Sequence, residues 1–302
     1  MAMSNYPGGF GGGVTIQNVP IQMAVPNKVF WVDSNGGGGS KGTFDHPVAT
    51  LAAALDLCTA SKGDVIMLKA GHSESPVVTI DLDIAGVSII GLGVGRNRPT
   101  FIPTFTVASD IVFNVSADDI LFKNIIVEDG TNTGGNSNQF SVSANNFTME
   151  DCLIEQGAIN LVAVVLVSGY DEFTARRCLF LGTAANPDVA IQIGSGSGDC
   201  ENFTASECVF NYMGSSGLDL GGIWSTKINT GILIEHCTFI GMDDAGVNFA
   251  SNATGLINRC VAYSTVASVN EMFIPGTCGA SECYGTYNSV QGILAPATTA
   301  TT

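Results

Sequence analysis

The chain has 302 residues, of which 45% are hydrophobic and 13% are charged. This composition excludes a disordered protein, because disorder goes with few apolar residues and many charges. The formal net charge is −16, so we do not expect nucleic acid or an anionic membrane as a partner, since their phosphates would repel the surface. The N-terminus shows no signal peptide and the chain has no long apolar run, so we expect synthesis in a cytoplasm.

Residues 1–27 form a first segment of their own. They combine five glycines between positions 8 and 13 with alternating apolar residues. Such a segment cannot fold alone, and its apolar side chains are costly to leave in water. We therefore expect an extended attachment arm that orders against a partner, with a disordered leader as the alternative. The candidate partner-binding residues of the arm are Phe10, Val14, Ile16, Val19, Ile21 and Met23.

Residues 28–63 are expected to hold a leading strand and a capping helix. Thr50 is a suitable N-cap and Gly63 lies near the expected C-cap. Four apolar residues have the spacing of one helical face: Leu51, Ala54, Leu55 and Cys58. A helix here would cover the open front end of whatever sheet follows.

A short pattern recurs from about residue 118 to residue 283. Copies such as "NFTMEDCLI", "EFTARRCLF" and "NFTASECVF" read as apolar-x-apolar-x-x-Cys-x-apolar. The alternation is typical of half-buried strands, and no copy shows a helical stripe. Equivalent positions are Ile125, Cys152, Cys178, Cys208, Cys237, Cys260 and Cys283, with spacings from 23 residues (260 to 283) to 30 residues (178 to 208).

Coils of this length, stacked so that equivalent strands pair, bury faces that one short strand cannot bury alone. The sequence therefore predicts an all-β protein, a right-handed parallel β-helix of roughly eight coils over residues 64–290. The first buried strands are expected at 64–71 and 87–93, and residues 291–302 are expected to be a flexible tail. At about 4.8 Å per rung, the stack would be roughly 40 Å tall.

The recurring cysteines are expected to form an internal ladder. Its members are Cys152, Cys178, Cys208, Cys237, Cys260 and Cys283. Free, packed thiols are the favoured interpretation, because cysteine behaves as a small buried hydrophobe. Disulfides and a metal site stay open as alternatives, although nine cysteines is an odd number and no CxxC pair occurs.

Residues 29–75 carry a resemblance to a known family. The stretches "VFWVDSNGGGGSKGTFDHPVATLAAALDLC" and "GDVIMLKAGHSE" resemble the opening of right-handed β-helix proteins of the pectate-lyase-like superfamily. The most similar versions are carried in tailed-phage virion genes. The resemblance implies the β-helix fold, a virion context and a homotrimer. It leaves activity open, because the superfamily includes both enzymes and inert structural proteins.

Candidate catalytic residues are few. Enzymes of this superfamily need carboxylates for acid and base chemistry, or calcium beside a basic residue. Asp243 and Asp244 faintly resemble the paired aspartates of polygalacturonases, but the companion motifs are absent and a turn is the favoured interpretation. Arg176 or Arg177 is expected beside Glu150 and Glu207 on the outer face, as a surface charge ladder. No metal or cofactor site is predicted.

These observations favour a non-enzymatic structural protein of a tailed-bacteriophage virion. It would decorate or cement the outer capsid surface, with the major capsid protein or another virion protein as its partner. One alternative is a phage tailspike or another β-helix glycan-active enzyme. A second alternative is a receptor-binding adhesin that holds a host-surface glycan. All three would be made in the host cytoplasm, and the first would act on the capsid exterior.

Overall fold

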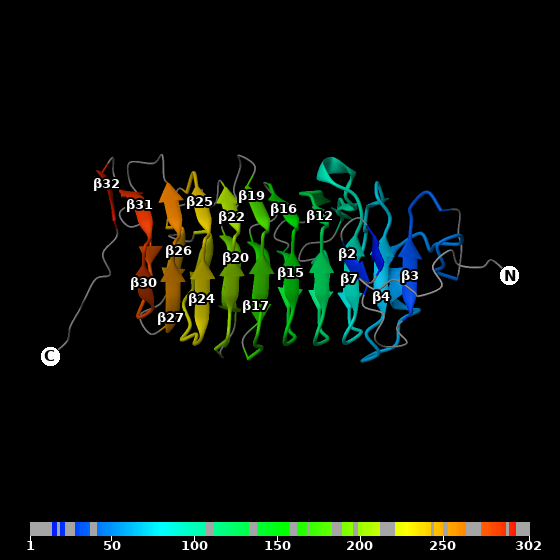
Figure 1. Ribbon diagram of the computed structural model, residues 1–302, viewed down its shortest axis with the longest axis horizontal. Helices are drawn as coiled ribbons and strands as arrows, with labels where there is room; N and C mark the ends of the chain where they lie inside the picture. The colour runs from blue at the N-terminus through cyan, green and yellow to red at the C-terminus, as the bar shows by residue number, and fades with distance from the viewer. Residues whose placement is uncertain are drawn as a thin grey trace.

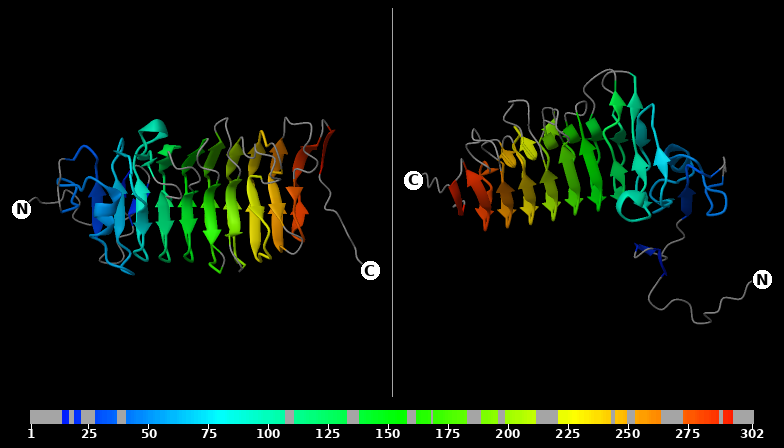
Figure 2. Two further views of the ribbon diagram at one scale, coloured as in Figure 1. Left: turned by 180° about the vertical axis from the view of Figure 1, so that it is seen from behind. Right: turned by 90° about the horizontal axis from the view of Figure 1, so that it is seen from above.

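The structure is a computed structural model of the whole chain. It describes residues 14–16, 19–21, 28–36, 41–106, 111–132, 138–157, 162–167, 169–182, 189–195, 199–211, 221–242, 245–249, 253–263, 273–287 and 290–293. The chain winds as a right-handed parallel β-helix, so the predicted fold class is confirmed (Figures 1 and 2). Within the described residues, no helix is long and apolar enough to cross a bilayer.

Three long sheets form the walls of the solenoid, and the chain visits them in a fixed order. Sheet I contains β6 (Ile80–Leu82), β10 (Phe113–Val115), β14 (Asn138–Val142), β17 (Val162–Val167), β20 (Val189–Ser195), β23 (Ile223–Ser225), β26 (Val247–Phe249) and β29 (Phe273–Ile274). Sheet II contains β3 (Val29–Val32), β4 (Val65–Leu68), β7 (Ser88–Gly91), β11 (Leu121–Lys123), β15 (Thr148–Glu150), β18 (Thr174–Arg176), β21 (Thr204–Ser206), β24 (Ile232–Glu235), β27 (Gly255–Asn258) and β30 (Gly279–Ser281). Sheet III contains β5 (Ser73–Glu74), β8 (Thr100–Phe101), β12 (Ile126–Val127), β16 (Leu153–Gln156), β19 (Leu179–Gly182), β22 (Val209–Asn211), β25 (Thr238–Ile240), β28 (Val261–Tyr263), β31 (Tyr284–Tyr287) and β32 (Val290–Ile293).

The register between coils follows the repeat of the sequence. In sheet II the central residues pair in one row through Phe122, Met149, Ala175, Ala205, Ile234, Ile257 and Ala280. All but the last are fully buried, whereas their strand neighbours are more exposed. The apolar residue of each copy therefore points inward, as the period of two requires.

Stacked phenylalanines fill much of the core. Phe180, Phe210 and Phe239 lie on successive strands of sheet III, with ring centroids 5.0 and 4.8 Å apart and nearly parallel planes. Phe173 and Phe203 stack at 5.6 Å where the chain enters sheet II. Rings repeated at the same position in each coil meet at the rung spacing, which is within the range for favourable offset stacking.

A short helix closes the front end of the solenoid. Helix α1 (Leu51–Leu55) begins at Thr50, whose hydroxyl accepts a hydrogen bond from the Ala53 N–H. Its buried face packs on the first coils, as predicted. The helix ends earlier than the apolar spacing suggested, because the N–H of Leu57 and of Cys58 bond three residues back and tighten the last turn. A single 3-10 turn, η1 (Gly95–Asn97), follows β7.

His72 fixes this cap to the solenoid. Its buried ring accepts a hydrogen bond at Nδ1 from the Ser34 N–H, so Nε2 carries the proton and donates to Glu74 at 3.2 Å. The same Glu74 carboxylate accepts from the Leu51 N–H at the start of α1. The leading strand β3 pairs in parallel with β4 and is thus the outermost strand of sheet II.

Three small features depart from the regular parallel winding. Strands β1 (Val14–Ile16) and β2 (Val19–Ile21) pair antiparallel in a sheet of their own, within the predicted arm. Strands β9 (Thr104–Phe105) and β13 (Thr131–Asn132) form a second two-stranded sheet. At the other end, β32 pairs antiparallel with β31, so residues 291–293, which were predicted to belong to a flexible tail, are part of a strand.

Candidate functional site

In each coil from β11 to β30, one residue turns the chain from sheet II into sheet III. It adopts a positive φ between 50° and 58°, which costs an ordinary residue roughly 1 kcal/mol. Its N–H donates to the next coil, as from Arg177 to the Ser206 carbonyl at 3.0 Å, which offsets that cost. These bend residues are Asn124, Asp151, Arg177, Glu207, His236, Arg259 and Glu282. The bend directs the following residue inward and leaves the bend side chain outside.

The residues that follow the bends form the cysteine ladder inside. Each of the six ladder cysteines is at most 2% exposed. Each Sγ lies 3.4 to 3.6 Å from a carbonyl oxygen of the preceding coil. All nine cysteines of the chain are free thiols in the structure. The ladder thus consists of packed thiols that donate weak hydrogen bonds to the backbone.

Burial keeps several of the cysteine thiols neutral. It raises the pKa of Cys152 and Cys178, and it raises the pKa of the off-ladder Cys278 to about 11. Only the thiolate is a nucleophile or a metal ligand. Cys200 and Cys278 are buried like the ladder, and Cys58 alone is partly exposed. Cys152, Cys178 and Cys278 therefore serve packing at neutral pH.

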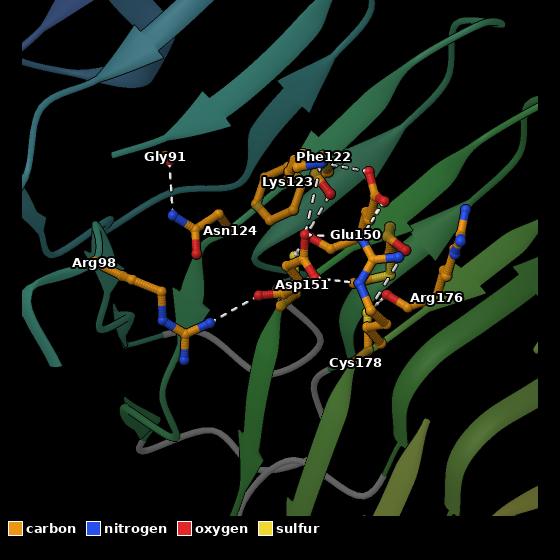
Figure 3. A network of polar contacts seen from close by, with 12 residues as sticks. Gly91, Arg98, Phe122, Lys123, Asn124, Glu150, Asp151, Arg176 and Cys178 are labelled. Atoms are coloured by element: carbon orange, nitrogen blue, oxygen red, sulfur yellow. Dashed lines mark hydrogen bonds and ion pairs between the residues drawn. The ribbon is translucent and has the colours of Figure 1, made fainter. Parts of the chain in front are cut away.

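The outer side of the same bends carries a network of charges (Figure 3). Arg177 donates from Nε to Asp151 at 2.7 Å and from its terminal nitrogen to Glu150. Lys123, one coil earlier, donates to Glu150 at 2.7 Å and lies 3.6 Å from Asp151. Arg98 donates to the Asp151 backbone carbonyl at 2.7 Å. Two cations and two carboxylates are thus matched across three successive coils.

The charges of this network hold one another in the ionised form. Burial would raise the pKa of Glu150, but hydrogen bonds from Lys123 and Arg177 outweigh it and hold the pKa below its usual range. The pKa of Asp151 is lowered in the same way, against burial, chiefly by Arg177. The hydrogen bond to Asp151 in turn raises the pKa of Arg177. Glu150, Asp151 and Arg177 are therefore held in their charged forms at neutral pH.

Sequence reasoning found part of this network. The expected contact of an arginine with Glu150 is present, and it belongs to Arg177, while Arg176 is exposed (Figure 3). The second acid is Asp151, on the same coil as Glu150, and not the predicted Glu207, which lies on the coil after Arg177. The missed signal was that Asp151 and Arg177 occupy equivalent positions, one residue before a ladder cysteine, with opposite charges.

Several predicted site residues are not described by the structure. Asp243 and Asp244 lie outside the described residues, as do Phe10 and Met23 of the arm. The backbone of Val14, Ile16, Val19 and Ile21 is described in β1 and β2, without their side chains. In the described part of the chain, no three His, Cys, Asp or Glu residues are grouped so that they could hold a metal ion.

Comparisons with known proteins agree with this architecture. No protein-family profile matches the chain, and no curated protein is similar to it. Among solved structures, a rhamnogalacturonan lyase is similar with a TM-score of 0.55 and 17% identity over 79% of this chain and 69% of that one. A pectin methylesterase from Aspergillus niger has a TM-score of 0.50 and 17% identity over 88% and 87% of the two chains. A protein of Geobacillus virus E2 has a TM-score of 0.43 and 13% identity over 85% and 61%.

At such low identity the similarity shows the fold and not the activity. The lyase and the esterase support the same arrangement of stacked parallel strands that the repeat predicted. The chain is a right-handed parallel β-helix protein whose structural neighbours are the pectate-lyase-like β-helix proteins.

Proposed function

We propose that this chain is a non-enzymatic structural protein of a tailed-phage virion, which decorates or cements the outer capsid surface. The observation that carries the proposal is the separation of the arm from the shaft. Strands β1 and β2 pair only with each other, and no other described strand joins their sheet. An isolated two-stranded hairpin is marginally stable in water, so it needs a partner surface to order on.

The pairing of charges on the shaft supports the same proposal. The mixed-charge cluster at the bends is neutralised internally, with Lys123 and Arg177 against Glu150 and Asp151. Such a cluster stiffens a rod but does not supply a general acid or base. A rigid acidic shaft with a separate apolar arm suits attachment, with the major capsid protein or another virion protein as the partner.

Deletion of residues 1–27 tests this function. We expect the truncated shaft to stay soluble, to unfold at the temperature of the full chain, and to lose binding to particles stripped of this protein. Deletion of residues 294–302 at the other end is the matched control and should leave binding intact. Binding of the arm-deleted chain with unchanged affinity would place attachment on the shaft and refute the proposed role of the arm.

A glycan-active enzyme is the second candidate, because the rhamnogalacturonan lyase and the pectin methylesterase are named for reactions on polysaccharides. Product release from pectate, alginate and host capsule, with and without calcium, distinguishes it. We expect no turnover. Turnover that is lost on replacing Asp243 and Asp244 together by alanine would establish the enzyme instead. Binding of capsule without turnover would favour the adhesin.

A further inference from the structure

The outer face of sheet III is apolar along most of its length. One row of outward side chains pairs from coil to coil through Ile126, Leu153, Leu179, Val209, Thr238, Val261 and Tyr284. Their neighbours in the strands, such as Phe180 and Phe239, point into the core. The outside of a solenoid wall faces water in an isolated chain, so an apolar row there needs a cover.

Among the described residues, this row is well covered at the first coils. Ile126 is fully buried and Leu153 is 7% exposed. The segment around η1 reaches over these coils, since Arg96 pairs with Glu128 and Glu155 beside them. Exposure then rises along the row, to 45% at Val261 and 49% at Tyr284. The row is thus buried at β12 and β16 and exposed at β28 and β31.

The open end of this face is a compact patch, which we call the C-terminal patch. It consists of Ile240, Val261, Tyr263 and Tyr284. Ile240 is in register with Tyr263, and Val261 with Tyr284, so the four side chains occupy adjacent positions on β25, β28 and β31. Its edge carries the ion pair of Arg259 with Glu282, at 2.7 Å. An apolar centre with tyrosines and a charged rim is the composition of protein interfaces.

We propose that the C-terminal patch is where copies of this chain associate, with the patch of one copy against the patch of another. The charge distribution favours a second copy of the chain as the partner of this patch. The chain carries a net charge of −16, yet the patch has no charge at its centre and a balanced pair at its rim. Two such patches meet without placing like charges together, and Arg259 of one copy can face Glu282 of the next.

The spacing of the patch side chains also favours a second copy as the partner. The patch side chains stand at the strand spacing of about 4.8 Å, which is the rung repeat of the solenoid. A second copy with its axis parallel presents the same side chains at the same repeat, so that rows interdigitate over all three coils. Copies arranged with their C-terminal ends together around one axis bring patch to patch, so a closed symmetric assembly covers every patch.

Self-association of the free protein needs no capsid, so its test is separate from that of the arm. The full chain is measured by size-exclusion chromatography with light scattering at tens of micromolar. We expect a mass of at least twice the 31.2 kDa of one chain. The double variant Val261→Glu, Tyr263→Glu should run as a monomer with an unchanged far-UV spectrum. The matched control is Val78→Glu, which changes a side chain that is 68% exposed at the other end of the solenoid.

A crosslinking experiment gives a second readout that does not depend on solubility. Because the natural cysteines are buried or partly buried, an added surface thiol is the reactive one. Val261→Cys should form a disulfide between copies under mild oxidation, and Val78→Cys should not. A monomeric wild-type chain, or an oligomer that persists in the double variant, would overturn the proposal. A monomer whose patch variants lose particle binding would assign the patch to another virion protein instead.

Discussion

The Cys208 thiol lies 3.4 Å from the backbone carbonyl oxygen of Ala175 on the preceding coil. The same relationship joins Cys237 to Ala205, one coil further on. The position follows a sharp bend and faces the core beside a backbone carbonyl, and it holds the buried Ile125 in one coil and cysteine in the next six. Cysteine suits the position because it is small, apolar and a weak hydrogen-bond donor. The ladder is therefore a packing solution repeated in each coil.

Substitution of Cys208 should show how much this position depends on size and charge. Cys208→Asp places an unpaired charge in a fully buried site and should lower the free energy of unfolding by about 3 kcal/mol or more. Cys208→Ala only removes the sulfur and should cost about 1 kcal/mol. Denaturant unfolding followed by circular dichroism measures both. Equal stability of the two variants would contradict the buried position.

Thiol labelling of the native protein should be confined to Cys58. The other off-ladder cysteines, Cys200 and Cys278, are buried, so the number of reactive thiols is smaller than the sequence pattern suggested. Burial, and then the nearby Asp64, raises the pKa of Cys58 to about 12. Its labelling rate should therefore be low at pH 7 and rise about tenfold per pH unit.

Mass spectrometry after reaction with a maleimide identifies the labelled residue. Labelling in denaturant should modify all nine cysteines. Cys58→Ser should abolish native labelling without affecting the denatured control. Rapid modification of Cys178 or Cys208 in the native protein would be inconsistent with the fold.

Stability should fall in alkaline solution because of the buried thiols. Burial raises the pKa of Cys152, Cys178 and Cys200, whereas the unfolded thiols titrate at about 8.5. Above that pH the unfolded chain releases protons that the folded chain keeps. Each buried thiol therefore makes its full contribution to the free energy of unfolding below about pH 8.5. This contribution is lost as the pH rises toward the folded-state pKa, by about 1.4 kcal/mol per thiol per pH unit.

The free energy of unfolding measured at pH 8 and pH 10 tests this dependence. Cys178→Ala should flatten the slope by the contribution of one thiol. Arg176→Met, which leaves every thiol in place, serves as the control. A variant slope equal to that of the wild type would mean that Cys178 is not protected from ionisation.

The stacked architecture could be predicted from the sequence because each coil repeats the same pattern of core residues. Phe173 and Phe203 occupy equivalent positions of two copies, and they stack in the core. The alternation of apolar residues sets which face is inside, and the recurrence of cysteine marks the bend. These are local signals, and each coil supplies them again.

The contacts between coils were harder to predict, because they depend on the length of each turn. Lys123 meets Glu150 only because the two strands are aligned residue by residue across 27 positions of chain. Cys200 and Cys278 lie in turn segments without periodicity, so nothing in the pattern indicated their burial. The C-terminal patch was missed for a related reason, since outward apolar residues look like core until the register is known.

The ion-pair network of Arg177 should stabilise the middle coils in a pH-dependent way. Arg177→Met keeps the length of the side chain but removes three hydrogen bonds to Glu150 and Asp151. The side chains are partly exposed, so we expect a loss of about 1 kcal/mol at neutral pH. Arg176→Met, at the exposed neighbouring residue, should cost much less.

The sign of the pH dependence follows from the lowered pKa of Glu150 and of Asp151. Carboxylates that ionise more easily in the folded chain stabilise it at a pH above their unfolded-state pKa of about 4. This contribution is lost as the pH falls below that value and through the lower folded-state pKa. The difference in stability between wild type and Arg177→Met should therefore shrink between pH 6 and pH 3. It should also shrink in 1 M salt, which screens partly exposed pairs. A difference that stays constant with both pH and salt would mean that Arg177 acts through packing alone.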